Sequence, residues 1–369
     1  MKNLESRLNP GLLGITPYEA GKTVSEAANE RRGQSMDFIK MASNENPLGM
    51  SPAALEALGR RAAEGSAYPE ISGRETRLAL AERLRISPDN IILGNGGDGI
   101  IYACAMAMLD QGDEAVIPDL TFPYYEIAVR AMRGTIVRSP MKQLAIDLDD
   151  VLSRITPRTK MIWIANPNNP TGALIDKKAF DDFYRRVPED VFCIHDEVYA
   201  DFAETAAFPD TLNLIREGRD NLFLIRSFSK IYGLAGVRVG YGVGAAELVN
   251  MMYRVRPPFD VSVLAQIAAA AAVGDETFYT RSIELNTREK EFLQAELKKR
   301  GVRPLPTATN FILVNVGRNG RELAERLLEK GVIVRASSHP LIRDCIRVTI
   351  GTHEQNTVFL AALDKALAS

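Results

Sequence analysis

Cysteine and histidine are both scarce in this sequence of 369 residues, which contains three of each. The cysteines, at positions 104, 193 and 345, lie in separate apolar segments and are too few for a disulfide framework or a zinc site. None of the histidines stands at ligand spacing from another histidine or from a cysteine. We therefore predict a reduced, cytoplasmic setting and no metal centre.

An excess of charge and a long apolar run are missing as well. The formal net charge is -2, and Arg and Lys are spread along the chain, so electrostatics give no reason to expect a nucleic acid or an anionic membrane as partner. No apolar run approaches the length of a membrane span, and the first 14 residues lack the apolar core of a signal peptide. The composition, 46% hydrophobic and 25% charged, is typical of a globular protein.

Short apolar runs alternate with longer helical patterns in the middle of the chain, after a first helix that should begin at Ser51-Pro52. Runs of this kind separated by helices indicate a mostly parallel sheet that is covered on both faces. We predict such an α/β/α sandwich as a large domain over residues 46–260. Its strands are expected at 91–93, 115–118, 161–165, 191–195, 222–226 and 237–243, with helices near 98–109 and 124–132.

The pattern changes after about residue 261. A long amphipathic helix is expected over 276–300 and should end at Gly301 as its C-cap. Shorter strands and helices follow, and the last helix opens with a capping box formed by Thr352 and Gln355. We predict a smaller α+β domain over residues 261–369, completed by an N-terminal arm of residues 1–45. Its strands are expected at 311–314, 332–335 and 346–350, with a helix at 321–330.

The segment that decides the chemistry ends in Lys230 and follows the predicted strand 222–226. Ligands bind beyond the carboxyl ends of strands in open α/β sheets, so a lysine at this exit is well placed for one. Ser227 and Ser229 offer hydroxyls to a phosphate beside it, and Arg238, expected to start the next strand, would pair with the same phosphate. An ordinary surface lysine is the alternative when this residue is taken alone.

Two further strand ends carry polar groups that suit an aromatic heterocycle. Asn169 follows strand 161–165 in an Asn-Pro-Thr-Gly segment, where its amide would donate to a ring oxygen; a rigid turn is the alternative. Asp196 follows strand 191–195 and would pair with a protonated pyridine nitrogen, which keeps the ring an electron sink. Tyr199 would reach the phenolic oxygen of that ring. A helix N-cap is the alternative role of Asp196.

The glycine-rich segment 94–99 supports two different cofactors. It joins a predicted strand to a predicted helix, whose N-terminal N–H groups would bind a phosphate. It also reads G-x-G-x-x-G, with Asp119 about twenty residues later, which is the fingerprint of a dinucleotide site and favours a nicotinamide dehydrogenase. That enzyme would give no role to Lys230 or Asn169. A pyridoxal phosphate site uses all of these segments and is therefore the preferred interpretation.

These motifs, together with Ser-Asn-Glu-Asn-Pro at 43–47 and Ala-Tyr-Pro at 67–69, resemble the fold-type I aminotransferases, and among them the histidinol-phosphate aminotransferase family. The resemblance runs from residue 17 to residue 347. It implies the fold of the PLP-dependent (pyridoxal-phosphate-dependent) transferases and a homodimer with shared active sites. Segment 256–262 departs from the family, because it carries Asp and Ser where many relatives carry Asn, and we expect this departure to affect specificity rather than cofactor binding.

The resemblance also implies a role for each residue of the site. Lys230 would form an imine with pyridoxal phosphate, Asp196 would pair with the pyridine nitrogen, and Asn169 and Tyr199 would contact the ring oxygen. Phe122, unless it is a plain core aromatic, would stack on the ring. The phosphate would be held by Gly97, Asp98, Ser227, Ser229 and Arg238, and by Tyr68 of the neighbouring subunit, while the substrate would meet Tyr18, Asn46, Arg335 and Arg347. Structural carboxylates are the alternative partners of the two arginines.

We predict from these features a ping-pong transamination. Lys230 would act as general base and then as general acid on the substrate, with glutamate as the amino donor. Imidazole-acetol phosphate is the first choice of acceptor, which would make the reaction histidinol-phosphate:2-oxoglutarate transamination. An aromatic amino acid aminotransferase and a phosphothreonine-type decarboxylase of the same fold remain alternatives. A nicotinamide dehydrogenase and a catalytically silent binding module are the alternatives from other classes.

Overall fold

The structure is a computed structural model of the chain, and it describes residues 4–18, 21–30, 38–204 and 206–368. Among these residues, no helix is long and apolar enough to cross a membrane. The same residues contain no group of three or more His, Cys, Asp or Glu side chains that could hold a metal ion. The described part of the chain contains six short 3-10 helices: η1 (Leu4–Arg7), η2 (Pro10–Gly14), η3 (Ala62–Ser66), η4 (Pro88–Asn90), η5 (Ala200–Phe202) and η6 (Pro340–Ile342).

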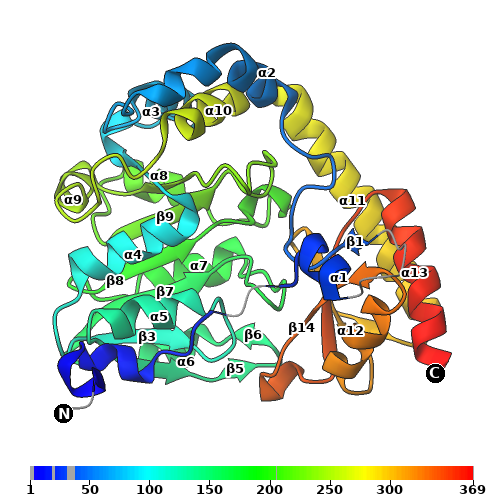
Figure 1. Cartoon of the computed structure of the whole chain (residues 1–369). Coiled ribbons are helices and arrows are strands. Elements are labelled where there is room, and N and C mark those ends of the chain that lie inside the picture. The colour runs from blue at the N-terminus through cyan, green and yellow to red at the C-terminus, as the bar shows by residue number, and fades with distance from the viewer. Residues whose placement is uncertain (1–3, 19–20, 31–37, 205, 369) are drawn as a thin grey trace.

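A seven-stranded sheet forms the centre of the larger part of the molecule (Figure 1). Its order is β2-β10-β9-β8-β7-β3-β4, and neighbours are parallel except that β10 is antiparallel to both β9 and β2. The predicted mostly parallel sheet is therefore confirmed. Its strands are β2 (Ile91–Gly94), β3 (Glu114–Pro118), β4 (Thr135–Ser139), β7 (Thr159–Ala165), β8 (Phe192–Asp196), β9 (Leu222–Ser227) and β10 (Gly240–Val243).

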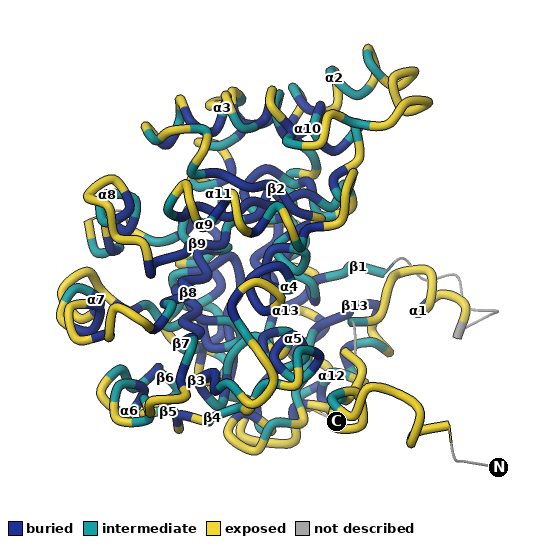
Figure 2. Tube along the Cα trace, turned by 90° about the vertical axis from the view of Figure 1, so that its left-hand side faces the viewer, coloured by how far each residue is buried: buried dark blue, intermediate teal, exposed yellow. Residues whose placement is uncertain are grey.

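Helices cover both faces of this sheet, as Figure 2 shows. Successive residues of a strand point to opposite faces, so Cys193 and Ile194 of β8 belong to two different buried apolar clusters. The predicted three-layer sandwich is thus confirmed. On one side lie α6 (Leu148–Ser153), α7 (Lys177–Tyr184) and α8 (Thr211–Arg216), and on the other lie α4 (Gly96–Met108) and α5 (Tyr124–Ala131). Helix α9 (Ala246–Met252) packs against α4 in the same apolar cluster. Two short strands, β5 (Met141–Lys142) and β6 (Ala145–Ile146), form a hairpin of their own.

Three helices pack together at one end of the sheet, at the top of Figure 1: α2 (Pro52–Arg61), α3 (Arg74–Leu84) and α10 (Val263–Val273). Ser51 begins α2 as predicted, because its hydroxyl accepts the N–H of Ala54 at 3.4 Å. The long helix α11 (Glu276–Lys299) then leads to the smaller part of the molecule. It ends just before Gly301, whose φ of +73° favours glycine, as the predicted cap requires.

A four-stranded antiparallel sheet forms the centre of the smaller part, in the order β11-β12-β15-β14. The capping box of the last helix is confirmed: Thr352 N–H donates to Gln355 Oε1 at 2.9 Å, and Gln355 N–H donates to Thr352 Oγ1 at 3.3 Å. The elements are β11 (Arg303–Pro304), β12 (Phe311–Asn315), α12 (Gly320–Leu328), β14 (Arg335–Ala336), β15 (Cys345–Thr349) and α13 (His353–Ala368).

One strand predicted at 332–335 is divided in two. Its first half, β13 (Val332–Ile333), pairs with β1 (Ile39–Lys40) of the N-terminal arm, and only its second half joins the four-stranded sheet. The chain therefore changes partner at residue 334. This pairing could not be read from the apolar pattern, because residues 332–334 are apolar throughout and mark no change of partner.

The N-terminal arm contacts both parts of the molecule. Helix η2 packs on α5 of the larger part, where Asn9 Nδ2 donates to the carbonyl of Ala131 at 3.2 Å. Further along, Ala27 of α1 (Val24–Glu30) packs with Ile333, next to the β1–β13 pair. The predicted packing of the arm with the smaller part therefore describes only its second half. The domain boundaries after residues 45 and 260 stay predictions.

Candidate active site

Three parallel strands of the large sheet end side by side and release the predicted site segments at one edge. Asp196, the last residue of β8, pairs with Ala165 at the end of β7 and with Ile225 near the end of β9. The segments that carry Asn169, Tyr199 and Lys230 therefore leave the sheet from neighbouring positions. This convergence follows from parallel pairing, because the carboxyl ends of parallel neighbours share an edge.

The antiparallel strand β10 brings two more segments to the same edge. It begins at Gly240, which pairs with Ser227 of β9 on one side and with Gly94 of β2 on the other. Arg238 precedes this strand in a turn with a φ of +63°, so the prediction that it starts the strand is wrong. The reversed strand direction places the arginine where the glycine segment leaves β2.

Arg238 contacts two of the residues predicted to bind the same phosphate. Its Nη2 donates to Asp98 Oδ2 at 3.1 Å, and its Nη1 lies 3.5 Å from Ser229 Oγ. Ser227 Oγ accepts the N–H of Ser229 at 3.1 Å, which fixes the turn that leads to Lys230. Two hydroxyls and a guanidinium thus surround one point beyond the sheet edge.

The first turn of α4 faces this point with free backbone N–H groups. Gly97 and Asp98 lie in that turn, and the preceding Asn95 makes no side-chain cap to it. Uncapped N–H groups and the helix dipole together favour an anion. Glycine is required at two places: a Cβ on Gly240 would lie 2.6 Å from the carbonyl carbon of Gly96, and a Cβ on Gly96 would lie 2.3 Å from Arg238 Nη2.

The order of the sheet excludes the dinucleotide interpretation of the glycine segment. A dinucleotide site needs the strand that carries the acidic residue to lie beside the strand before the glycines. Here β10 is the neighbour of β2, and four strands separate β2 from β3, at whose end Asp119 lies. The carboxylate of Asp119 instead forms an ion pair with Arg138, with Oδ1 of Asp119 3.9 Å from Nη1 of Arg138. The prediction of a nicotinamide dehydrogenase as an alternative is therefore wrong.

Asp196 is a buried carboxylate held by two donors. Its Oδ2 accepts the hydroxyl of Tyr125 at 2.5 Å, and its Oδ1 accepts the N–H of Val198 at 3.0 Å. Burial raises the pKa of Asp196 to about 6, and the two hydrogen bonds act in the opposite direction. No helix starts here, because η5 begins only at Ala200, so the alternative role of Asp196 as a helix N-cap is wrong.

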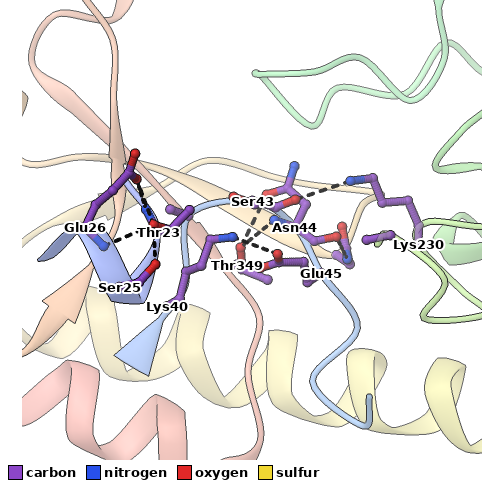
Figure 3. A network of polar contacts seen from close by, with 12 residues as sticks. Thr23, Ser25, Glu26, Lys40, Ser43, Asn44, Glu45, Lys230 and Thr349 are labelled. Atoms are coloured by element: carbon purple, nitrogen blue, oxygen red, sulfur yellow. Dashed lines mark hydrogen bonds and ion pairs between the residues drawn. The ribbon is translucent and has the colours of Figure 1, made fainter. Parts of the chain in front are cut away.

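Lys230 points from the larger part toward the N-terminal arm (Figure 3). Its Nζ donates to the backbone carbonyl of Ser43 at 3.3 Å and lies 5.6 Å from the centre of the Tyr199 ring. Burial, followed by the positive charge of Arg347, lowers the pKa of the Lys230 amine to about 8. A substantial fraction of this amine is therefore neutral and nucleophilic near neutral pH.

The arm also supplies Asn44, for which the sequence predicts no role. Asn44 is buried with a φ of +56°, and its Nδ2 donates to the hydroxyl of Tyr199 at 2.8 Å. Its backbone N–H donates to Thr349 Oγ1 of β15 at 3.0 Å, so it ties the two parts of the molecule together at this point (Figure 3). The only signal in the sequence was its place in the Asn-Glu-Asn-Pro segment.

Arg347 of β15 reaches across from the smaller sheet to the strand-end residues. Its Nη1 donates to Asn169 Oδ1 at 2.6 Å and its Nη2 donates to the carbonyl of Ala42 at 2.8 Å. Its buried Nε has no hydrogen-bond partner among the residues that the structure describes. Because Arg347 occupies the amide oxygen of Asn169, the amide NH2 group stays turned toward other acceptors.

A cavity of about 950 Å³ opens beside Arg347, between the arm, the larger part and the smaller part. The rings of Tyr18 and Phe122 meet edge to face in its wall, with their centroids 6.1 Å apart. Arg335 pairs with Arg347 across β14 and β15, and both line the cavity together with Asn169. Three of the four residues predicted to meet the substrate thus share one space.

Asn46 and Tyr68 lie elsewhere. Asn46 does not line the cavity: its Nδ2 donates to the carbonyl of Ile231 and to Ser282 Oγ, both at 2.9 Å, and its Oδ1 accepts the N–H of Leu48. Tyr68 is 82% exposed, and its ring stacks on that of Phe259 at 4.6 Å. Its predicted role concerns a neighbouring subunit and stays a prediction.

The segment that departs from the family pattern contacts the glycine segment. Asp260 Oδ2 accepts the N–H of Asn95 at 3.0 Å, directly before α4. This carboxylate therefore lies next to the N-terminus of α4, and it does not line the cavity. The expectation that the departure affects specificity rather than cofactor binding stays a prediction.

Next to these strand ends, an ion pair joins the buried Glu197 to the partly buried Arg226. Glu197 accepts Nε and Nη2 of Arg226 at 2.8 and 2.5 Å, His195 Nδ1 at 2.9 Å and the hydroxyl of Thr211. Burial acts to raise the pKa of Glu197, but the charge of Arg226 and these hydrogen bonds lower it to about 2. The pair joins the residue that follows β8 to Arg226 of β9, next to the Asp196–Ile225 pair of the sheet.

Known proteins are similar to this chain in sequence and in fold. Residues 36–363 match the family model described as aminotransferase class I and II. Histidinol-phosphate aminotransferase from Moorella thermoacetica is 42% identical over 357 residues, which cover 97% of this chain and 92% of that protein. The crystal structure of histidinol-phosphate aminotransferase from Sinorhizobium meliloti in complex with pyridoxal-5'-phosphate superposes with a TM-score of 0.91 and 26% identity over 98% of both chains. Aspartate aminotransferase from Thermus thermophilus with maleate gives a TM-score of 0.82, also at 26% identity and 98% coverage of both chains.

Proposed function

The chain belongs to the class I and II aminotransferase family, and from that premise we propose that it is a pyridoxal-phosphate-dependent histidinol-phosphate aminotransferase. The proposed reaction moves an amino group between histidinol phosphate and 2-oxoglutarate. The observation that carries the proposal is the meeting, at one sheet edge, of an amine of lowered pKa, a buried carboxylate and an uncapped helix N-terminus.

The residues at this edge fit pyridoxal phosphate group by group. The uncapped first turn of α4 matches the phosphate, and Ser227, Ser229 and Arg238 would hold it from the other side. Asp196 would pair with the ring nitrogen. The Asn169 amide and the Tyr199 hydroxyl would contact the ring oxygen, and Phe122 would lie against the ring.

Lys230 would do the proton chemistry. When bound, pyridoxal phosphate supplies an aldehyde carbon that exchanges amines and a ring that accepts an electron pair. The Nζ of Lys230 would hold the aldehyde carbon until the amino group of the substrate displaces it. The freed Nζ would then take a proton from the substrate α-carbon. It would deliver this proton to the cofactor carbon that had carried the aldehyde. A pKa of about 8 suits both directions near neutral pH.

The cavity supports an anionic substrate. Histidinol phosphate ends in a phosphate and glutamate ends in a carboxylate, and a guanidinium binds either as a planar fork. The buried Nε of Arg347 has no hydrogen-bond partner among the described residues, and Arg335 lies across from Arg347 in the sheet. Tyr18 and Phe122 would offer an aromatic wall to the imidazole ring.

We also propose that the protein forms a homodimer and lies in the cytoplasm. The exposed stack of Tyr68 on Phe259 supports a homodimer in which Tyr68 completes the phosphate site of the neighbouring subunit. The three cysteines are free and buried, which supports a reducing cytoplasm.

Single-turnover measurements on the loaded protein test the substrate. Histidinol phosphate should convert the bound cofactor to its amine form faster than phenylalanine does, and 2-oxoglutarate should reverse the change. Lys230→Ala should abolish turnover and still fold. Borohydride should fix the cofactor to the peptide that contains Lys230. Preference for phenylalanine would favour an aromatic aminotransferase, release of carbon dioxide would favour a decarboxylase, and normal turnover by Lys230→Ala would refute the site.

A further inference from the structure

Tyr125 has no part in the function proposed above, although it contacts Asp196 directly. Its side chain is fully buried in α5, and its ring stacks on that of Trp163 in β7 with the centroids 4.7 Å apart and the planes at 12°. Its hydroxyl donates to Asp196 Oδ2 at 2.5 Å. Stacking leaves the phenol little freedom, so the position of this donor is fixed by the core of the larger part.

We propose that Tyr125 is a positioning residue, whose hydroxyl keeps the Asp196 carboxylate ionised and turned toward the ring nitrogen of the cofactor. This inference rests on the proposed function, because it takes Asp196 to be the partner of that nitrogen. Tyr125 does not touch the cofactor in this scheme. It acts only through the carboxylate.

The direction of the hydrogen bond is settled by the phenol. Burial and the charge of Asp196 raise the pKa of Tyr125 well above its ordinary value, so the phenol keeps its proton over the whole working range of pH. The contact is therefore O–H to carboxylate, a charge-assisted hydrogen bond, which is stronger than one between neutral groups.

Asp196 needs such a donor because its surroundings favour the neutral acid. Burial acts most strongly against its charge, and the negative charge of Asp98 on α4 acts in the same direction. Cys104 of α4, which also faces this carboxylate, is neutral, because burial raises the pKa of its thiol well above the ordinary value. Tyr199 likewise faces Asp196 in its neutral form.

Three contacts favour the ionised carboxylate. The hydroxyl of Tyr125 is the first of them, the backbone N–H of Val198 is the second, and the electrostatic influence of the neighbouring His195 is the third. Only the hydroxyl of Tyr125 can be removed without altering the strand end itself. Its loss should raise the pKa of Asp196 above about 6, so that a larger share of the carboxyl is neutral at pH 7 and unable to pair with a protonated ring nitrogen.

Retention of the cofactor measures this effect without recourse to activity. The loaded, full-length protein is dialysed at a series of pH values from 5 to 9, and the fraction of pyridoxal phosphate kept is read from its absorbance. For Tyr125→Phe we expect the midpoint of loss on the acid side to move up by about one pH unit, which is a tenfold change in the proton affinity of one group. At pH 9, where Asp196 is ionised in both proteins, retention should be equal.

Tyr184→Phe is the matched control. Tyr184 is also buried, its ring stacks on Phe180 at 5.8 Å, and its hydroxyl donates to an oxygen, Asn221 Oδ1, at 2.5 Å. Its loss should lower the thermal stability about as much as the loss at Tyr125. It should leave the midpoint of cofactor retention where it is, because Tyr184 does not contact Asp196.

A double-mutant cycle separates a positioning role from a structural one. In an Asp196→Asn background, Tyr125→Phe should no longer move the midpoint, since the group through which it acts is gone. An unmoved midpoint for Tyr125→Phe in the wild-type background, or an equal shift in both backgrounds, would overturn the inference. If Tyr125→Phe does not fold, Tyr125 is replaced by fluorotyrosine, which is a stronger hydrogen-bond donor. The pH midpoint of cofactor retention should then move down, and an unmoved midpoint would overturn the inference as well.

The two proposals fail in distinguishable ways. A shifted midpoint in a protein that does not turn over histidinol phosphate would refute the proposed substrate and keep Tyr125 in its role. Normal turnover of histidinol phosphate with an unmoved midpoint would refute the role of Tyr125 alone.

Discussion

The Lys230 amine should react with aldehydes near neutral pH, and the charge of Arg347 should be part of the reason. Burial and then Arg347 lower the pKa of this amine from 10.5 to about 8. At pH 7.5 about a quarter of the molecules then carry the neutral amine, whereas an amine of ordinary pKa would be neutral in about one molecule in a thousand. The environment thus raises the concentration of the nucleophile more than a hundredfold, by roughly this same reckoning.

Arg347→Met removes the charge and keeps a long side chain in the same space. Loss of a neighbouring like charge should raise the pKa of Lys230 by about one unit. The neutral fraction at pH 7.5 should then fall from about a quarter to about 3%. Arg347→Lys is the matched control, because it keeps the charge and should leave the pKa of Lys230 near 8.

Reductive labelling measures this pKa directly. The protein freed of cofactor is exposed to a small aldehyde and cyanoborohydride at pH 6 to 11, and labelling of the Lys230 peptide is followed by mass spectrometry. We expect midpoints near 8 for the wild type and for Arg347→Lys, and near 9 for Arg347→Met, about one unit higher. A wild-type midpoint above 10 would refute the argument from burial, and equal midpoints in both variants would remove Arg347 from it.

Three further predictions concern stability. Asp196→Asn should flatten the pH dependence of urea unfolding between pH 4 and 6. The pKa of Asp196 is raised to about 6, so this carboxyl binds a proton more readily in the folded protein than in the unfolded one. It therefore adds up to about 3 kcal/mol to the free energy of unfolding at low pH, and this contribution is lost as the pH rises through 6. Gly240→Ala should lower the free energy of unfolding by about 1–3 kcal/mol and weaken cofactor retention, because the new Cβ meets the backbone of Gly96. Glu197→Gln should cost about 3–5 kcal/mol in urea unfolding, since it leaves the charge of Arg226 buried, and adding Arg226→Met should restore part of the loss.

The site residues at the edge of the large sheet could be predicted, because their positions follow from a local sequence pattern. Each of Asn169, Asp196 and Lys230 follows an apolar run of strand length, and runs separated by helices indicate parallel neighbours. Parallel neighbours end together, so the three residues had to meet if the three strands were adjacent. Adjacency was the one step that the sequence left open, and β7, β8 and β9 are adjacent.

Contacts between distant segments could not be predicted in the same way. The sequence does not say that β10 runs antiparallel, and this direction decides that Arg238 meets the glycine segment instead of lying at the opposite edge. Asn44 and Asn46 belong to the same Asn-Glu-Asn-Pro segment, and the sequence does not distinguish their roles. The φ of +56° at Asn44 turns its amide to Tyr199, whereas the amide of Asn46 donates to the backbone carbonyl of Ile231. Such choices depend on packing against residues hundreds of positions away.

The charge of Arg347 connects the proton chemistry of Lys230 with the binding of an anionic substrate. It holds the amide oxygen of Asn169 and lowers the pKa of Lys230, and it lines the cavity where an anionic substrate would bind. A phosphate or carboxylate placed against its guanidinium would cancel much of that charge, and the pKa of Lys230 would rise. The amine would therefore be a better nucleophile before the substrate arrives and a stronger base once the substrate is in place. Each state matches what the amine must do in it, because capture of an aldehyde needs the neutral form and removal of a proton from carbon needs basicity.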